Sequence, residues 1–78
     1  MTIILNGEPF SVDDIAPESV RPPDATSVTI ADLLTHLDID PRRVTVERNF
    51  LVVKRAAYDS TQIIDGDEIE IVNFVGGG

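Results

Sequence analysis

The sequence predicts an α+β protein of the β-grasp type, with a mixed sheet of about five strands packed on one helix. Three observations lead to this fold class. A β-hairpin pattern opens the chain, one amphipathic helix follows it, and three short strand patterns fill the second half. The order β-β-α-β-β-β leaves a single helix to cover the sheet. We expect the first and last strands to lie parallel and adjacent at its centre.

The hairpin is predicted over residues 2–12. Thr2 to Leu5 is β-branched and aliphatic, and Asn6-Gly7 is the strongest short hairpin signal, because both central residues of its turn take positive φ. Pro9 cannot donate a ladder hydrogen bond, so we expect the returning strand to lie at an edge.

The helix follows a proline-rich surface loop, expected over residues 13–27. Thr29 is a good N-cap, and Asp32 three residues later resembles the second half of a capping box. Pro41 bars continuation, so we expect the helix to end by Leu37 or Asp38. Four apolar residues share one helical face at i, i+3, i+4 and i+7: Ile30, Leu33, Leu34 and Leu37.

The remaining strands are predicted at 44–47, 51–53 and 68–75, and Ile63-Ile64 precede a tight turn at Asp65-Gly66-Asp67. The last strand is apolar on one face and acidic on the other at first, and both faces become apolar toward its end. We expect one β-grasp domain over residues 1–75 and a flexible glycine tail at 76–78.

Composition excludes several classes of function. The net charge is −8, from 14 acidic and 6 basic residues, which argues against a nucleic-acid partner and against an anionic membrane surface. The chain has no cysteine, so disulfides, thiolate metal sites and a persulfide are excluded. No run approaches the ~20 apolar residues of a membrane span, and we expect a cytoplasmic protein.

The glycines Gly76-Gly77-Gly78 are the main candidate for function. Glycine loses the most freedom on ordering, so a triplet contributes little to a fold, yet it can thread a narrow channel. From Val75 to Gly78 the extended chain reaches ~13 Å. We expect the Gly78 carboxylate to be the reactive group, with Phe74 and Val75 as an apolar contact for a partner, surrounded by acidic residues.

Several motifs resemble the thiamine-biosynthesis sulfur carrier family, which is ubiquitin-like. They are Asn6-Gly7-Glu8, the helix start at 29–34, Val46-Glu47-Arg48-Asn49, and the run from Asp65 to Val72 before the glycines. The resemblance implies that an adenylating (E1-like) enzyme uses ATP and Mg²⁺ to activate Gly78, that sulfur then replaces AMP, and that thiazole synthase takes the sulfur. It implies a carrier, not an enzyme, with no cofactor of its own.

Other functions stay open at this point. They are a sulfur carrier for molybdopterin, for cysteine synthesis or for tRNA thiolation, a ubiquitin-like protein modifier, and a plain interaction module. The remaining polar residues favour structural roles. We expect His36 on the surface, Tyr58 as a partly buried loop anchor, and Asp65 and Asp67 as turn residues with no metal.

Overall fold

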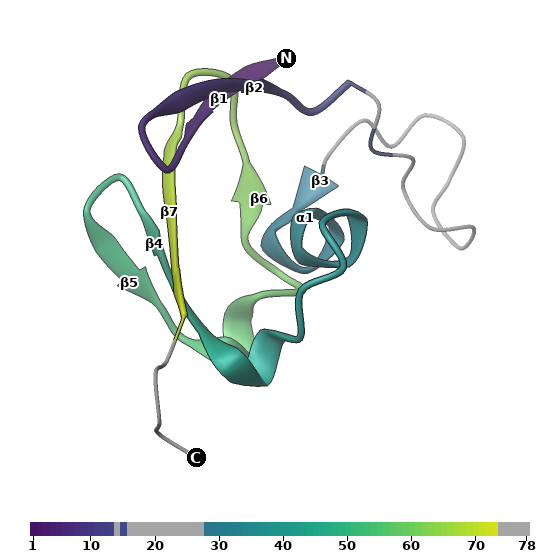
Figure 1. Ribbon diagram of the computed structural model, residues 1–78, viewed down its shortest axis with the longest axis vertical. Coiled ribbons are helices and arrows are strands. Elements are labelled where there is room, and N and C mark those ends of the chain that lie inside the picture. The colour runs from purple at the N-terminus through teal and green to yellow at the C-terminus, as the bar shows by residue number, and fades with distance from the viewer. Residues whose placement is uncertain (14, 16–27, 74–78) are drawn as a thin grey trace.

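A computed structural model describes residues 1–13, 15 and 28–73, and its elements are shown in Figure 1. In chain order they are β1 (Thr2–Leu5), β2 (Glu8–Ser11), β3 (Val28–Thr29), α1 (Ile30–His36), the 3₁₀ turn η1 (Pro41–Arg43), β4 (Val44–Arg48), β5 (Leu51–Val53), the 3₁₀ turn η2 (Arg55–Ala57), β6 (Gln62–Ile63) and β7 (Glu68–Asn73).

Five of these strands form one sheet in the order β2-β1-β7-β4-β5. The first strand, β1, pairs parallel with β7, and β4 pairs antiparallel with β7 on its other side. The expected parallel pair of first and last strands is therefore confirmed, with β7 at the centre. Pro9 lies in β2, an edge strand, as predicted. The mixed sheet and the one helix of the described residues confirm the β-grasp fold.

The turn residues of both hairpins take the left-handed backbone that two-residue loops require. Asn6 and Gly7 have φ of 50° and 85° between β1 and β2. Asn49 and Phe50, with φ of 52° and 70°, connect β4 to β5 in the same way. Two positive φ values in a row match the right-handed twist of the flanking strands.

Helix α1 begins at a complete capping box. The Asp32 N–H donates to Thr29 Oγ1 at 3.2 Å, and the Thr29 N–H donates to Asp32 Oδ2 at 2.9 Å. Both contacts satisfy N–H groups that have no acceptor within the helix. The predicted N-terminus is confirmed.

The helix ends where predicted, but the cause is not Pro41. Asp38 takes φ of 58°, and its N–H donates to the Thr35 carbonyl at 3.1 Å. The Ile39 N–H then donates to the Leu34 carbonyl at 2.9 Å, which completes a Schellman motif. Pro41 instead occupies the first position of η1, where its missing N–H has no consequence.

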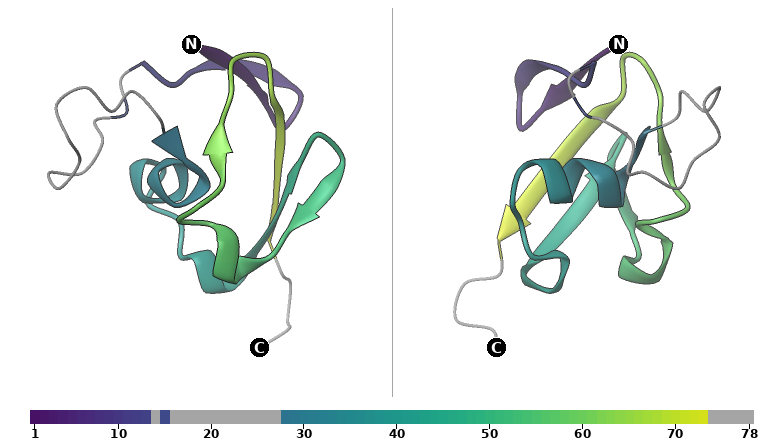
Figure 2. Two further views of the ribbon diagram at one scale, coloured as in Figure 1. Left: turned by 180° about the vertical axis from the view of Figure 1, so that it is seen from behind. Right: turned by 90° about the vertical axis from the view of Figure 1, so that its right-hand side faces the viewer.

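One small feature was not predicted. Val28 and Thr29 form β3, which pairs antiparallel with β6 and leads directly into α1. A two-residue ladder leaves too short a pattern to recognise in a sequence. It joins the helix start to the segment before β7, on the side of the sheet that α1 covers (Figure 2).

The core lies between the sheet and α1. In the described part of the chain, its buried apolar residues are Ile3, Val12, Ile15, Val28, Ile30, Leu33, Leu34, Val44, Val46, Tyr58, Ile63 and Ile69. The opposite face of the sheet carries no helix among these residues (Figures 1 and 2). Across the described ranges, no helix has the length and apolar character to cross a membrane.

Candidate functional site

The central strand β7 determines where the chain leaves the domain. Its last residue, Asn73, pairs with Val44 at the start of β4, at the end of the molecule where η1 and η2 also lie (Figure 1). Phe74, Val75 and the glycines 76–78 come next and lie outside the described residues. Their predicted roles therefore remain predictions, and the structure fixes only the point from which they depart.

Strand β7 is held along both of its sides. The Ile4 N–H donates to the Asp67 carbonyl and the Asn6 N–H to the Ile69 carbonyl, both at 2.9 Å. The Asn6 side chain adds a contact that no ladder supplies, because its Oδ1 accepts from the Ile71 N–H at 2.8 Å. Asn6 thus shapes the first hairpin turn and also fixes the strand that leads to the exit.

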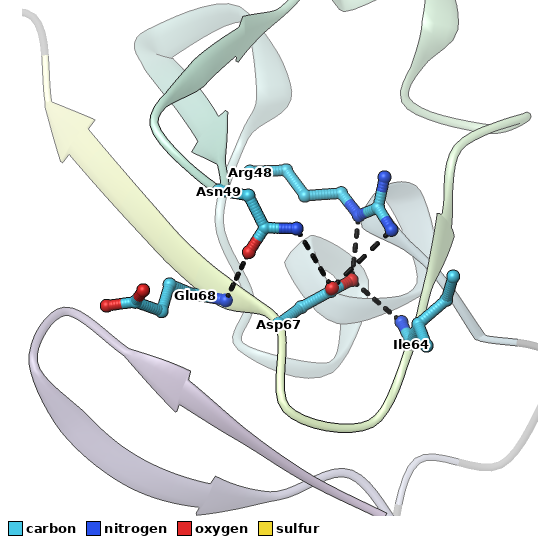
Figure 3. A network of polar contacts seen from close by, with 5 residues as sticks. All are labelled: Arg48, Asn49, Ile64, Asp67 and Glu68. Carbon is cyan, nitrogen blue, oxygen red and sulfur yellow. Dashed lines mark hydrogen bonds and ion pairs between the residues drawn. The ribbon is translucent and has the colours of Figure 1, made fainter.

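The start of β7 is anchored by a polar network around Asp67 (Figure 3). Its carboxylate accepts from Arg48 Nε at 2.7 Å, from Asn49 Nδ2 at 3.1 Å and from the Ile64 N–H at 2.8 Å. Asn49 Oδ1 accepts in turn from the Glu68 N–H at 3.0 Å. The network joins the β4–β5 turn to the turn before β7.

Asp67 remains ionised in this network at neutral pH. Burial by itself raises the pKa of its carboxyl, since only 7% of the side chain is exposed. The hydrogen bonds from Arg48, Ile64 and Asn49 outweigh burial and hold the pKa below its ordinary value of 3.8. The sequence indicated only a turn residue here, because the two side-chain donors, Asn49 and Arg48, lie 18 and 19 residues away along the chain.

The open face of the sheet carries an acidic hollow. It is lined by residues of β1, β4, β7 and the two hairpin turns: Ile4, Gly7, Glu47, Phe50, Glu68, Ile69 and Glu70. Glu47 and Glu70 lie directly opposite each other on β4 and β7. Like charges in this position repel, so the hollow is better suited to a basic group than to an acidic one.

Apolar side chains are exposed around this face and the β5 edge. The most exposed large ones among the described residues are Phe50, Leu51, Val52, Ile64 and Val72. Phe50 is 75% exposed in a left-handed turn position, where a non-glycine residue carries strain. Phe50 was not among the residues predicted for the site, although its place after Asn49 in a two-residue loop was a usable signal.

The charges nearest the exit differ from the expectation. Acidic residues were expected around it, but Arg42, Arg43, Lys54 and Arg55 lie in or beside η1 and η2, at the same end of the molecule. The three glutamates of the hollow instead line a surface that includes the hairpin turns. The reason is topological: β4 begins beside the last residue of β7, and β5, on the other side of β4, ends opposite Val46.

Several polar residues were predicted to have structural roles. His36 is exposed, and its ring meets the edge of Phe10 with centroids 6.4 Å apart. Tyr58 is more buried than expected, at 5% exposure, and its hydroxyl donates to the Val44 carbonyl at 3.4 Å. Asp65 accepts from the Thr2 N–H at 2.9 Å, as a turn residue can. The described residues contain no cluster of His, Asp and Glu able to hold a metal ion.

In residues 1–13, 15 and 28–73, one helix packs on a mixed sheet whose central strand leads toward a glycine triplet, and this arrangement defines a small β-grasp protein. Comparison with protein families goes one step further. The model of the ThiS family matches residues 3–78, so the chain belongs to the ThiS family.

Individual relatives agree with this membership. A crystal structure of the thiamine biosynthesis protein (ThiS) from Geobacter metallireducens is similar with a TM-score of 0.75 and 37% identity, and each chain is covered completely. The sulfur carrier protein ThiS of Bacillus subtilis (strain 168) is 44% identical over 50 residues, which is 64% of this chain and 76% of that protein.

A second kind of relative is much longer. A thiazole synthase of Paramagnetospirillum magneticum is 36% identical over 78 residues, all of this chain but only 20% of that protein. The chain thus spans about a fifth of the length of the thiazole synthases that it matches.

Proposed function

We propose that this protein is a sulfur carrier for thiamine biosynthesis and that Gly78 is its reactive residue. The observation that supports the proposal is membership of the ThiS family over residues 3–78, a range that includes the glycine triplet. The name of the Bacillus subtilis relative points to sulfur transport, and the names of the longer relatives point to thiazole synthesis. We further propose that the protein is not an enzyme, that it works in the cytoplasm, and that it holds no cofactor.

The chemistry follows from the poor reactivity of a carboxylate. An oxygen of the Gly78 carboxylate attacks the α-phosphorus of ATP, pyrophosphate leaves, and an acyl-adenylate forms. A sulfur nucleophile then forms a bond to the carbonyl carbon, the bond to the AMP oxygen breaks, and a thiocarboxylate remains. Phosphate chemistry of this kind needs Mg²⁺ and cationic groups around the leaving group, which we assign to an adenylating partner enzyme with its own ATP and Mg²⁺.

The carrier's own contribution is positioning. β7 is fixed by ladders on two sides and by the Asp67 network at its start, so the chain departs from Asn73 in one direction. A rigid departure point reduces the number of arrangements that a partner must select from. Gly76 and Gly77 have no side chains to obstruct a narrow channel, and we propose that Phe74 and Val75 contact the partner at its entrance.

Intact-mass analysis tests the proposal. The protein is incubated with the adenylating enzyme of the same organism, Mg-ATP and a sulfide source, and we expect the mass gain of one oxygen replaced by sulfur. Deleting Gly78, or adding one residue after it, should abolish the gain, because the reactive carbon moves by ~3.5 Å. Glu8→Gln, in the edge strand β2, is the matched control and should react normally.

Two results would contradict the proposal. One is an unchanged rate of activation with the extended tail. The other is a mass of the native protein showing that Gly78 is joined through a peptide bond to a further residue. Isopeptide-linked conjugates in a cell lysate would favour a protein modifier instead. A reconstituted reaction with thiazole synthase tests the thiamine assignment against the other pathways. The protein is first charged with isotopically labelled sulfur, and incorporation of that sulfur into the thiazole product is measured.

A further inference from the structure

The basic residues of this acidic chain are concentrated at one end. Four of the six Lys and Arg residues lie in or beside η1 and η2: Arg42, Arg43, Lys54 and Arg55. Both 3₁₀ turns lie at the end of the molecule where β7 stops (Figures 1 and 2). The end from which the tail departs is therefore the most cationic part of the described chain.

Three of these residues, Arg42, Lys54 and Arg55, line a hollow with an apolar wall. The hollow lies between η1, the start of β4, the end of β5 and η2, and its apolar residues include Val44, Val52 and Val53. Lys54 and Arg55 line it from one side and Arg42 from the other. We call the cationic side chains Lys54 and Arg55, together with this apolar wall, the basic groove; Arg43, the last residue of η1, does not line the hollow.

Arg42 contributes little to the charge of the groove. Its Nε and a terminal nitrogen donate to the two Asp40 oxygens at 3.1 Å and 3.0 Å, so the pair is neutral. This contact lowers the pKa of Asp40 to about 2. Arg43, Lys54 and Arg55 are exposed and form no ion pair within the described ranges. Asp59, an exposed carboxylate shortly after η2, offsets one of these three positive charges, so the net charge of the cluster remains positive.

The groove is close to the departing chain. Asn73 and Val72 pair with Val44 and Thr45, and both Val44 and Thr45 also line the groove. One strand spacing, about 4.8 Å, thus separates the end of β7 from the groove wall. Five extended residues span at most ~17 Å, so a protein that binds Gly78 must also approach this surface.

We propose that the basic groove binds an acidic segment at the entrance of the channel through which the adenylating enzyme receives the tail. This inference rests on the proposed function and adds the chemistry of the partner surface to it. A chain of net charge −8 is repelled by an acidic partner in most orientations. Only the end of the molecule that carries the basic groove is attracted to an acidic segment. Charge therefore favours the orientation in which the tail faces the partner. The aliphatic stems of Lys54 and Arg55 pack along the apolar wall while their charges meet carboxylates.

A protein partner is favoured over nucleic acid or a lipid surface. Three free cations on a strongly acidic chain are too few to overcome repulsion by a phosphate backbone or an anionic membrane. They are sufficient to orient an encounter between two proteins, where charges at the rim act mainly on the rate of association.

The test compares two variants with the same change of net charge. Lys54→Gln/Arg55→Gln removes two positive charges from the groove. Thr35→Glu/Gln62→Glu adds two negative charges at exposed positions of α1 and β6, away from the groove. Adenylation is measured as pyrophosphate release with the purified adenylating enzyme at low and high ionic strength, beside thermal melts of all three proteins.

We expect the groove variant to raise KM by about tenfold with kcat unchanged, and to flatten the dependence of kcat/KM on salt. The control variant should match the wild type in KM and melting temperature. Equal KM values for the two variants overturn the inference. So does an unchanged KM of the groove variant if the wild type binds single-stranded RNA or anionic phosphatidylserine vesicles and the groove variant has lost that binding. A wild-type protein that is not adenylated at all overturns the proposed function as well, whereas a failure confined to the variants leaves that function intact.

Discussion

Replacing Asp67 should destabilise the whole domain, because this carboxylate joins two turns that hold β7. Asp67→Ala leaves three buried or partly buried donors without an acceptor: Arg48 Nε, Asn49 Nδ2 and the Ile64 N–H. Breaking a buried ion pair typically costs ~3–5 kcal/mol. The Arg48 side chain is 27% exposed and regains some hydration, so the low end of this range applies.

We therefore expect Asp67→Ala to lower the free energy of unfolding by about 3 kcal/mol and the melting temperature by more than about 10 °C. Asp67→Asn keeps the shape and one acceptor oxygen but loses the charge, and about 1–2 kcal/mol should be lost. Urea denaturation followed by circular dichroism measures both. Asp59→Asn, at an exposed position without a hydrogen bond in the described structure, is the control and should change stability by less than about 0.5 kcal/mol.

Acid titration provides a second measurement of the same group. The folded-state pKa of Asp67 lies below the ordinary value of 3.8. Its stabilisation is therefore complete above pH 3.8 and is lost as the pH falls through the folded-state pKa. Asp40 and Asp13, whose pKa values are also lowered, titrate in the same range, so only the difference between wild type and Asp67→Asn reports on Asp67. An Asp67→Ala protein as stable as wild type, or an identical acid slope for Asp67→Asn, would refute the role given to the network.

Four further substitutions test the fold. Leu34→Ala should cost ~2–5 kcal/mol, since Leu34 is 1% exposed, and Leu37→Ala should cost less because Leu37 is only partly buried; thermal melts of both decide this. Asp38→Gly should stabilise the protein by about 0.5–1 kcal/mol in urea denaturation, because φ of 58° costs glycine nothing, and a destabilised variant would contradict the cap described. Gly66→Ala should destabilise by about 1–2 kcal/mol through φ of 85° alone, as an added Cβ meets no atom within 4 Å; an unchanged melting temperature would show that the turn relaxes.

Local signals in the sequence were sufficient for most of the secondary structure. Asn6-Gly7 determines a hairpin through the backbone preferences of two adjacent residues. Thr29 and Asp32 determine a helix start through contacts three residues apart. The final strand alternates apolar and acidic residues, which predicted its core face and its open face. Each of these features depends on neighbours within one turn or one strand, so the sequence displays it directly.

The parallel pairing of the first and last strands at the centre of the sheet was also predicted, because one helix and five strands with these connections leave few arrangements that bury a common core. The glycine triplet and its family resemblance led to the proposed carrier role, and the family membership is confirmed over residues 3–78. The residues from Phe74 onward are outside the described structure, so their part in that role rests on sequence.

Only the tertiary structure decided which distant residues meet. Asp67 looked like an ordinary turn residue, and its donors Arg48 and Asn49 come from another hairpin. Likewise, Arg43 and Lys54 are eleven positions apart by their numbering, yet η1 and the end of β5 bring them to the end of the sheet where β7 stops. The physical reason is that such contacts depend on strand register, and register is set by the burial of a whole face, not by any short segment.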